Sequence, residues 1–406
     1  YNHLRYPEAH PHSPWSMLEL KRTPETNIFD MIREKDLLIH LPYESFDESV
    51  VNFLYSAAND KDVLAIKQTL YRVSSSSPVV QALEKAVQNG KQVTVLMEVK
   101  ARFDEANNIL MARRLEKAGA HVIYGLVGLK THSKCTLVIR REKDGIRRYV
   151  HVATGNYNAS TAKLYTDLGI LTCSDRFGID ASAFFNLLSG YSDPPIWDSF
   201  IVAPINLRQR CIELIDREIH FAKNGEDAHM IAKMNSLLDK GIIEKLYEAS
   251  QAGVKIELIV RGICVLIPGI PGVSDNITVR SIVGRFLEHS RIFWFRNGGR
   301  EELYISSADW MPRNLNDRVE LMVPIEDPEI KRRLKQMVDI ELSDNQKAHI
   351  MQADGTWLKT ISAENQLCAQ EYFQKIAEKR DAEDEMTLAQ KLEPYTPVLG
   401  HGDGSD

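Results

Sequence analysis

Apolar and polar residues follow two patterns along the chain: helix-spaced stripes and short, continuous apolar runs. Residues 81–89 carry a helical stripe that Gly90 ends, and residues 92–99 follow as an almost unbroken apolar run. Glycine commonly ends helices, and an apolar run of this length between turn residues is typical of a buried strand. The first part of the chain therefore predicts a helix followed by a buried strand.

The same order of elements returns in the second part of the chain. There residues 242–251 form the helical stripe, Gly253 ends it, and residues 255–261 form the apolar run. Further strands follow at matching places, and polar or glycine-rich turns separate them. These strands are residues 121–124, 135–140 and 149–153 in the first part, and residues 277–280, 292–295 and 303–306 in the second. The repeat predicts two related halves.

Strands that alternate with helices in both halves indicate an α/β fold, in which each half is a mixed sheet flanked by helices. The Pro-rich, aromatic stretch at residues 191–197 is the expected boundary. A helix at residues 206–223 should open the second half, because its apolar residues share one helical face. These residues are Leu207, Cys211, Leu214 and Ile215. We predict domains at residues 20–199 and 200–370.

The two ends of the chain are expected to lie outside these domains. We expect residues 1–19 to be a remnant of an upstream domain, since the sequence starts without methionine and is rich in proline and histidine. Residues 371–406 are predicted to form a C-terminal tail. From Arg380 onward the sequence turns acidic and then rich in Gly and Asp, which is typical of a frayed end.

Composition narrows the classes of partner. The net charge of −6 argues against general nucleic-acid binding, so a polyanion must be bound by a local group of basic residues. No apolar run is long enough to predict a membrane span. The five cysteines have no metal-type spacing, which indicates reduced thiols and a cytoplasmic protein. Peripheral membrane association stays open.

Each half holds one histidine two residues before a basic residue, His132 before Lys134 and His289 before Arg291. In an extended chain, residues two apart lie on one face. The neighbouring cation favours the neutral, nucleophilic imidazole and can bind phosphate. If the halves pack by pseudo-twofold symmetry, both rings face one cleft. In-line displacement at phosphorus needs such a pair, one group attacking and one assisting the leaving oxygen.

This interpretation competes with a simpler one. Most of the 12 histidines should be ordinary surface or core residues, and one such pair alone says little. Two pairs at matching places in a repeat favour catalysis. The turn at residues 154–158 contains Gly155, Asn156 and Asn158, whose amides suit a phosphate or an imidazole, although a plain β-turn explains it equally well.

The arrangement resembles the phospholipase D superfamily, whose motif is HxK, a downstream Asp, and GSxN. The first copy departs from that motif, because Ile139 stands where the Asp is expected and Gly-Asn replaces Gly-Ser. The second copy has Arg291 for lysine and residues 306–309 in place of GSxN. These departures argue against simple phosphodiester hydrolysis.

Longer strings resemble bacterial polyphosphate kinase of the histidine-phosphorylating type, over roughly residues 20 to 370. They are residues 69–72, 100–108, 128–134, 151–158, 164–169, 259–264 and 285–291. The resemblance implies two phospholipase-D-like catalytic domains and a remnant of an upstream helical domain. It also implies reversible transfer of the ATP terminal phosphate to inorganic polyphosphate, with Mg²⁺ as cofactor and ATP or ADP as substrate. A homo-oligomer is expected by resemblance alone.

The resemblance also assigns the site residues. His132 is then the phosphorylated nucleophile and His289 the second catalytic histidine. The nucleotide would contact Tyr165, Arg261 and His289. The phosphates would be bound by Lys134, Arg291, Asn156, Asn158 and Arg318, with Glu320 as a further candidate.

A magnesium–phosphate site is implied at Arg72 and Arg102. Arginine and Mg²⁺ are both cations, so each arginine is expected to bind phosphate oxygens that share the metal. Asp104 and Glu105 are equally well explained as Mg²⁺ ligands or as solvated carboxylates. No P-loop motif is present, so rows of Arg and Lys should hold the phosphates.

Two other functions stay open. One is a phospholipase-D-type phosphodiesterase that uses the same histidines with water or an alcohol as acceptor. The other is an inactive module that binds polyphosphate or another polyanion without turnover.

Overall fold

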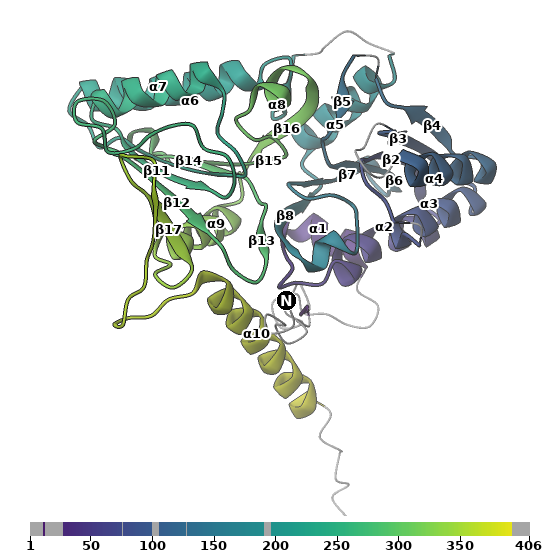
Figure 1. The fold of residues 1–406 in the computed structure, drawn as a ribbon. Coiled ribbons are helices and arrows are strands. Elements are labelled where there is room, and N and C mark those ends of the chain that lie inside the picture. Colours follow the sequence, from purple (N-terminus) through teal and green to yellow (C-terminus); the bar gives the residue numbers. More distant parts are fainter. Residues whose placement is uncertain are drawn as a thin grey trace, which may run out of the picture.

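The computed structural model describes residues 11–12, 27–74, 76–99, 105–126, 128–190 and 196–391. Within these residues the chain forms two mixed sheets with helices around them (Figure 1). The predicted α/β fold with two related halves is confirmed.

The first sheet follows the order β1-β8-β7-β6-β2-β3-β4. Helices α1 to α4 pack on one face of this sheet, whereas α5 packs on the face turned toward the second half. The strands are β1 (Leu37–Leu41), β2 (Val63–Leu70), β3 (Gln92–Met97), β4 (His121–Tyr124), β6 (Cys135–Glu142), β7 (Gly145–Ala153) and β8 (Tyr165–Thr172). The helical segments are α1 (Ile28–Glu34), η2 (Asp47–Val51), α2 (Asn52–Asn59), α3 (Pro78–Gln88), α4 (Glu105–Ala118), η3 (Thr161–Lys163) and α5 (Asp175–Leu188).

The second sheet follows the order β18-β17-β12-β11-β10-β14-β15-β16-β5, and β9 also pairs with β16. Its strands are β9 (Ile201–Ala203), β10 (His229–Met234), β11 (Lys255–Val260), β12 (Ile277–Ile282), β14 (Ile292–Phe295), β15 (Glu302–Ser306), β16 (Arg318–Pro324), β17 (Ala348–Met351) and β18 (Trp357–Lys359). The helical segments are α6 (Leu207–Lys223), α7 (Lys240–Gln251), η4 (Asn297–Gly299), α8 (Pro312–Asn316), α9 (Pro328–Leu342) and α10 (Ala369–Lys391).

Local sequence explains the helix ends. Ser77 caps α3 by accepting from the backbone N–H of Val80, and Pro78 occupies the first turn, where its missing N–H is not needed. Gly90 follows the helix with φ +79°, a conformation that glycine adopts without strain. The stop signal read from the sequence is therefore confirmed.

The two sheets share a core between them. Alternate residues of β10 face opposite ways: Met230 packs with α6 and α7, whereas Ile231 packs with α5, α9 and the start of α10. The same inner core contains Val150 of β7 and Phe184 of α5 from the first half. The halves are thus joined by a continuous apolar layer that fixes how their strand ends meet.

Two short strands cross between the halves. Strand β5 (Lys130–Thr131), from the first half, pairs in parallel with β16 of the second sheet. Strand β13 (Leu287–Glu288), from the second half, pairs in parallel with β8 of the first sheet. Each crossing strand ends directly before one of the predicted catalytic histidines.

The C-terminal end of the described chain is helical. The predicted C-terminal tail is wrong for residues 380–391, because these residues lie in α10, which runs away from the body of the molecule (Figure 1). Most residues of that stretch are strong helix formers, namely Ala, Glu, Arg, Met, Leu, Gln and Lys. Most of the predicted remnant at residues 1–19, and residues 191–195 of the predicted boundary, lie outside the described residues. In the part of the chain that the structure describes, no helix is both long and apolar enough to cross a membrane.

Candidate active site

The crossing strands place His132 and His289 by backbone hydrogen bonds to the opposite half. The N–H of His132 donates to the carbonyl of Val319 over 2.9 Å, and the N–H of His289 donates to the carbonyl of Thr166 over 3.2 Å. Each histidine is therefore fixed to a strand of the other sheet rather than to its own.

A buried carboxylate from the opposite half meets each imidazole. Nδ1 of His132 lies 2.9 Å from Oε2 of Glu320, and Nδ1 of His289 lies 2.8 and 2.9 Å from the oxygens of Asp167. A carboxylate only accepts, so it favours the tautomer with the proton on Nδ1 and leaves Nε2 for chemistry. Each half therefore supplies the carboxylate that orients the histidine of the other half.

Hydrogen bonds and close packing fix the carboxylates in turn. Glu320 accepts from Ser307 over 2.5 Å and from Asn314 over 2.6 Å. Asp167 accepts from Thr154 over 2.6 Å, and it lies so close to Gly155 that a Cβ there would sit 2.3 Å from its Cγ. The Thr-Gly turn thus serves to hold the carboxylate that orients His289.

Both imidazoles are kept neutral. The pKa of His132 lies well below its usual range, because the ring is buried and because Lys134, Arg318 and Arg291 surround it. Burial also lowers the pKa of His289, with Arg291 acting in the same direction and Asp167 against it. The mutual influence of these charges places the two histidines and their basic partners in one electrostatic environment.

The predicted contact between each histidine and the cation two residues later is confirmed. Nζ of Lys134 lies 3.0 and 3.1 Å from the ring nitrogens of His132, and Nη1 of Arg291 lies 3.3 and 3.2 Å from those of His289. Burial lowers the pKa of Lys134 to about 7, although Glu320 opposes the shift. Arg291 instead stays charged through its bonds to Asp309, at 3.1 and 3.2 Å.

The predicted nucleotide residues lie beside His289. The ring centroid of Tyr165 is 5.1 Å from that of His289. Arg261 donates to the side chain of Asn235 over 2.9 and 2.6 Å, and Asn235 donates to the carbonyl of His289 over 3.1 Å. The side chain of Asn235 therefore links Arg261 to the backbone of His289.

The remaining predicted residues fall into different groups. Arg318 belongs to the site electrostatically, since its charge helps to lower the pKa of His132. Arg72 follows Tyr71, whose ring centroid lies 4.8 Å from that of His132. Arg102 lies outside the described residues.

The two asparagines of the turn after β7 differ. Asn158 accepts from the backbone N–H groups of Ser160 and Thr161 over 3.0 and 3.1 Å, so its oxygen shapes the turn. The side-chain oxygen of Asn156 is buried without a hydrogen-bond partner in the structure. A buried acceptor of this kind is costly unless a donor or a cation binds it, so this oxygen fits a protonated or metal-bearing group rather than a bare phosphate oxygen.

The acidic, histidine and cysteine side chains are the groups that a metal site would require. Among the described residues, no group of three or more His, Cys, Asp and Glu is gathered so that it could hold a metal ion. Arg72 is a cation and supplies no donor for Mg²⁺.

Asp167 was not among the predicted site residues, although the sequence carries a signal for it. Tyr165-Thr-Asp167 and Arg318-Val-Glu320 place an acid at the same position of otherwise apolar strands, β8 and β16. An acid within a buried strand requires a partner. Matching the two strands in the repeat would have marked these acids as equivalent candidates, although not which histidine each one meets.

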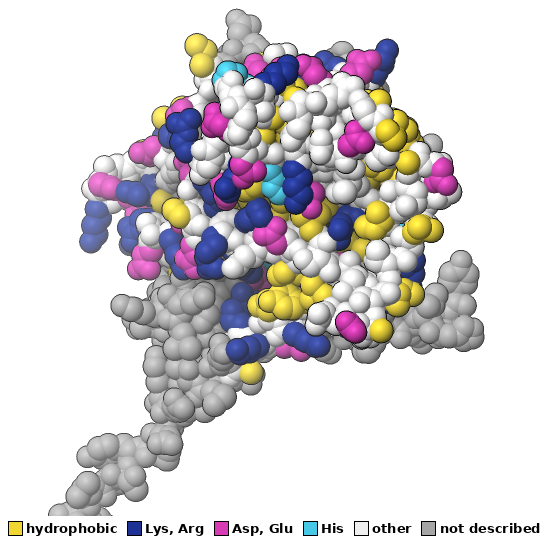
Figure 2. Space-filling model, turned by 90° about the vertical axis from the view of Figure 1, so that its left-hand side faces the viewer, with side chains coloured by type: hydrophobic (Ala, Val, Ile, Leu, Met, Phe, Trp, Pro, Cys, Tyr) yellow, Lys and Arg dark blue, Asp and Glu magenta, His cyan; other side chains and the backbone are white. Residues whose placement is uncertain are grey.

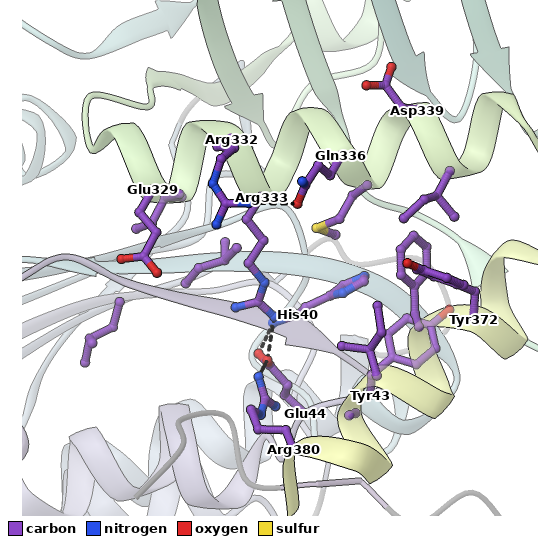
Figure 3. A pocket seen from close by; sticks show the side chains of 18 of the residues that line it. His40, Tyr43, Glu44, Glu329, Arg332, Arg333, Gln336, Asp339, Tyr372 and Arg380 are labelled. Carbon is purple, nitrogen blue, oxygen red and sulfur yellow. Dashed lines mark hydrogen bonds and ion pairs between the residues drawn. The ribbon is translucent and has the colours of Figure 1, made fainter. Parts of the chain in front are cut away.

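A separate cavity of about 580 Å³ lies between β1, α9 and α10. Neither His132 nor His289 lines it (Figure 3). On the outer face of the second half, Lys and Arg are interspersed with Asp and Glu (Figure 2). Among its described residues, this face therefore shows no continuous basic surface.

Two family models match the chain. The model described as polyphosphate kinase C-terminal domain 1 matches residues 27–194, and the one described as C-terminal domain 2 matches residues 200–370. The chain belongs to the polyphosphate kinase family. The expected family relationship is confirmed.

Individual relatives agree with this assignment. The chain is 58% identical over 348 residues to a polyphosphate kinase of Halalkalibacterium halodurans, covering 86% of this chain and 48% of the relative. It is 55% identical over 356 residues to one from Synechocystis sp., covering 87% and 49%. The crystal structure of polyphosphate kinase from Porphyromonas gingivalis matches with a TM-score of 0.85 and 38% identity, over 92% of this chain and 57% of that one. The chain thus spans about half the length of its curated relatives.

Proposed function

We propose that this chain holds the catalytic centre for reversible transfer of the terminal phosphate of ATP to inorganic polyphosphate through a phosphohistidine at His132. The observation that carries the proposal is the reciprocal pairing of His132 with Glu320 and of His289 with Asp167. Two neutral imidazoles, each oriented by a carboxylate, supply the attacking and the assisting group that an in-line displacement needs.

The first half-reaction starts at Nε2 of His132. Its lone pair attacks the γ-phosphorus, the new P–N bond forms, and the bond to the bridging oxygen breaks, so that ADP leaves with the electron pair. Glu320 accepts the hydrogen bond from Nδ1 and stabilises the positive charge that develops on the ring. In the second half-reaction a terminal oxygen of polyphosphate attacks the phosphorus and the P–N bond breaks.

We assign His289 to the leaving oxygen and to the nucleotide, together with Tyr165 and Arg261. Bound phosphates are negative, and a nearby negative charge raises the pKa of an imidazole. His289 can then carry a second proton, paired with Asp167 at Nδ1, and donate from Nε2 to the oxygen of the departing ADP. The same groups act in reverse when ADP is the acceptor.

The phosphate-binding group of this proposal contains cations from both halves. Lys134 and Arg291 lie against the two imidazoles, and Arg318 adds charge beside His132. Asn156 offers a buried oxygen that a protonated or metal-bearing group can satisfy, and Asn158 shapes its turn. Cations preorganised around the transferring phosphoryl group stabilise the charge that develops on its oxygens.

Histidine is the suitable nucleophile for a reversible reaction. A phosphoramidate bond to imidazole keeps a transfer potential near that of a phosphoanhydride, whereas a phosphoserine would be a low-energy product. We further propose that Mg²⁺ enters on the nucleotide phosphates, where it neutralises their charge, and that Arg72 and Arg102 bind oxygens of the same phosphates.

We also propose a domain assignment and a location for the reaction. The catalytic domains are residues 20–199 and 200–370, which the crossing of β5 and β13 supports as two interdependent units. The location is the cytoplasm, and the five cysteines, which are all free thiols, support it.

The proposal predicts a characteristic covalent label. Incubation of the protein with γ-labelled ATP and Mg²⁺ is expected to label it through a bond that acid cleaves and alkali does not. Peptide mapping should place the label on His132. His229 is the internal control, since it forms a comparable pair with Glu257 at 2.8 Å but lies outside the site.

Other outcomes separate the alternatives. Diester hydrolysis without ATP or Mg²⁺, and no label, would indicate a phosphodiesterase on the same scaffold. Tight polyphosphate binding without label or turnover would indicate a binding module. A label that survives acid, or that maps away from His132, contradicts the proposed intermediate.

The lowered pKa of Lys134 predicts that phosphate binding depends on pH. The ligand prefers the charged ammonium, so affinity for polyphosphate should be full below about pH 7 and should fall as the pH rises through that value. Lys134→Arg should abolish this fall, because guanidinium stays charged. Calorimetry measures the affinity of both proteins for polyphosphate from pH 6 to pH 9. Protonation of the ligand affects both proteins equally, so it cancels in the comparison. An equal fall in affinity for wild type and Lys134→Arg would contradict the prediction.

A further inference from the structure

The segment that leads into His289 is held by the first turn of α10. The side-chain oxygen of Gln370 accepts from the backbone N–H of Phe286 over 3.0 Å, and its Nε2 donates to the carbonyl of the same residue over 2.9 Å. The amide thus pairs with Phe286 as a neighbouring strand would. This contact joins helix α10 to the crossing strand β13.

The same amide also reaches the residue directly before His289. Nε2 of Gln370 donates to Oε1 of Glu288 over 2.6 Å. The other oxygen of Glu288 accepts from Lys233 over 2.6 Å and from Thr166 over 2.8 Å. Lys233 in turn contacts Glu341 of α9. A buried carboxylate held from three sides fixes the backbone on which His289 is carried.

The close approach of Gln370 to the chain depends on a glycine. A Cβ on Gly284 would lie 2.4 Å from the side-chain oxygen of Gln370, so the glycine allows the amide to approach the chain. The first half holds its own crossing segment differently, since Glu98 accepts from the backbone N–H of Thr131 over 2.9 Å. In the second half that task falls to a side chain of α10.

Helix α10 is itself seated against both halves. Phe373 packs on Tyr43 and His40 of the first half, with ring centroids 5.6 and 5.2 Å apart. Two turns further along, Arg380 binds the buried Glu44 over 2.8 Å, at the wall of the cavity between α9 and α10 (Figure 3). The position of Gln370 is thus set by contacts that do not involve the catalytic residues.

We propose that Gln370 is a positioning residue for the reaction, which holds the segment from Phe286 to Glu288 so that His289 stays directed at Asp167 and at the leaving oxygen. The inference rests on the proposed function, because it assigns Gln370 to the geometry of the second catalytic histidine. It makes α10 part of the active-site framework, although α10 contributes no group to the reacting atoms.

The test compares two identical substitutions on one helix. Gln370→Met keeps the length of the side chain but removes its hydrogen bonds, and Gln374→Met makes the same change one turn later, where the amide contacts His12. We expect Gln370→Met to lower kcat about 10- to 100-fold with KM changed less than about twofold, because a small displacement of a catalytic group costs rate rather than binding. Gln374→Met should match the wild type.

A second variant keeps the test decisive if Gln370→Met fails to fold. In Gln370→Glu the new carboxylate lies against the carboxylate of Glu288 and has no N–H to donate to it. Protonation of either carboxyl group supplies an O–H donor and restores a hydrogen bond between them. The kcat of Gln370→Glu relative to wild type should therefore recover as the pH falls, which a purely structural defect would not produce. The proposal is overturned if the kcat of Gln370→Glu does not recover at low pH, or if Gln370→Met has the kcat of the wild type.

A spectroscopic measurement separates this inference from the proposed function. Burial is the largest cause of the lowered pKa of His289, so release of its segment should raise that pKa toward the ordinary value. NMR titration of the imidazole in wild type and in Gln370→Met reports this change without any turnover. An unchanged titration refutes the role of Gln370, whereas a shifted titration in a protein without kinase activity refutes the proposed function alone.

Discussion

His132→Ala is expected to reduce phosphoryl transfer from ATP to polyphosphate by at least about 10⁴-fold, the scale seen when a catalytic nucleophile is removed. The acid-labile label should disappear with it. The physical reason is that the substitution removes the attacking atom itself, Nε2 of the neutral ring that Glu320 orients and Lys134 contacts. Radiometric assay of polyphosphate formation measures the loss.

Chemical rescue provides the control for this variant. The space left by the side chain lies between Glu320 and Lys134, so added imidazole should bind there and restore part of the turnover without restoring the covalent label. His229→Ala removes another histidine that pairs with a glutamate and should leave the rate unchanged. Turnover of His132→Ala within a factor of ten of wild type would contradict the assignment of the nucleophile.

The second large effect is expected for His289→Ala, with a loss of about 10²- to 10⁴-fold in kcat, the usual contribution of a general acid or base. The label on His132 should still form, but more slowly, because the attacking group is intact and the departing ADP has lost its hydrogen-bond donor. Rapid-quench measurement of label formation separates this step from the later transfer to polyphosphate.

Asp167→Asn tests the same role through the partner of His289. The amide cannot stabilise a doubly protonated ring, so the pH–rate profile should lose the limb that His289 produces, while nucleotide affinity changes little. A His289→Ala enzyme within a factor of two of wild type would refute the role of the second histidine.

Much of the local structure was predictable because it depends on short-range rules. Glycine stops and apolar runs located α3, β3, α7 and β11, and the four apolar residues predicted on one face of α6 are all buried. The repeat gave the two halves, since equal patterns fold into equal elements. The stretch after Arg380 is helical as far as Lys391 and not frayed as its acidic composition predicted, because most of its residues favour a helix.

The sequence predicted that each of the two histidines lies beside its cation, but not how the two halves pair. The repeated pattern made His132 and His289 the candidates, and side-chain alternation predicted Lys134 and Arg291 on the same face as the rings, where the structure has them. The sequence pattern does not predict that β5 pairs with β16 of the other half, or that β13 pairs with β8. Those pairings join segments more than a hundred residues apart.

The sequence by itself determined the class of chemistry: two equivalent imidazoles with cations at hand, in a duplicated α/β chain. The tertiary structure decided which carboxylate orients each ring, that burial more than the neighbouring cation keeps His132 neutral, and that Gln370 of α10 supports the His289 segment. The reason is physical. Side-chain alternation and helix stops act over a few residues, whereas desolvation and cross-sheet pairing arise only when distant segments are packed together.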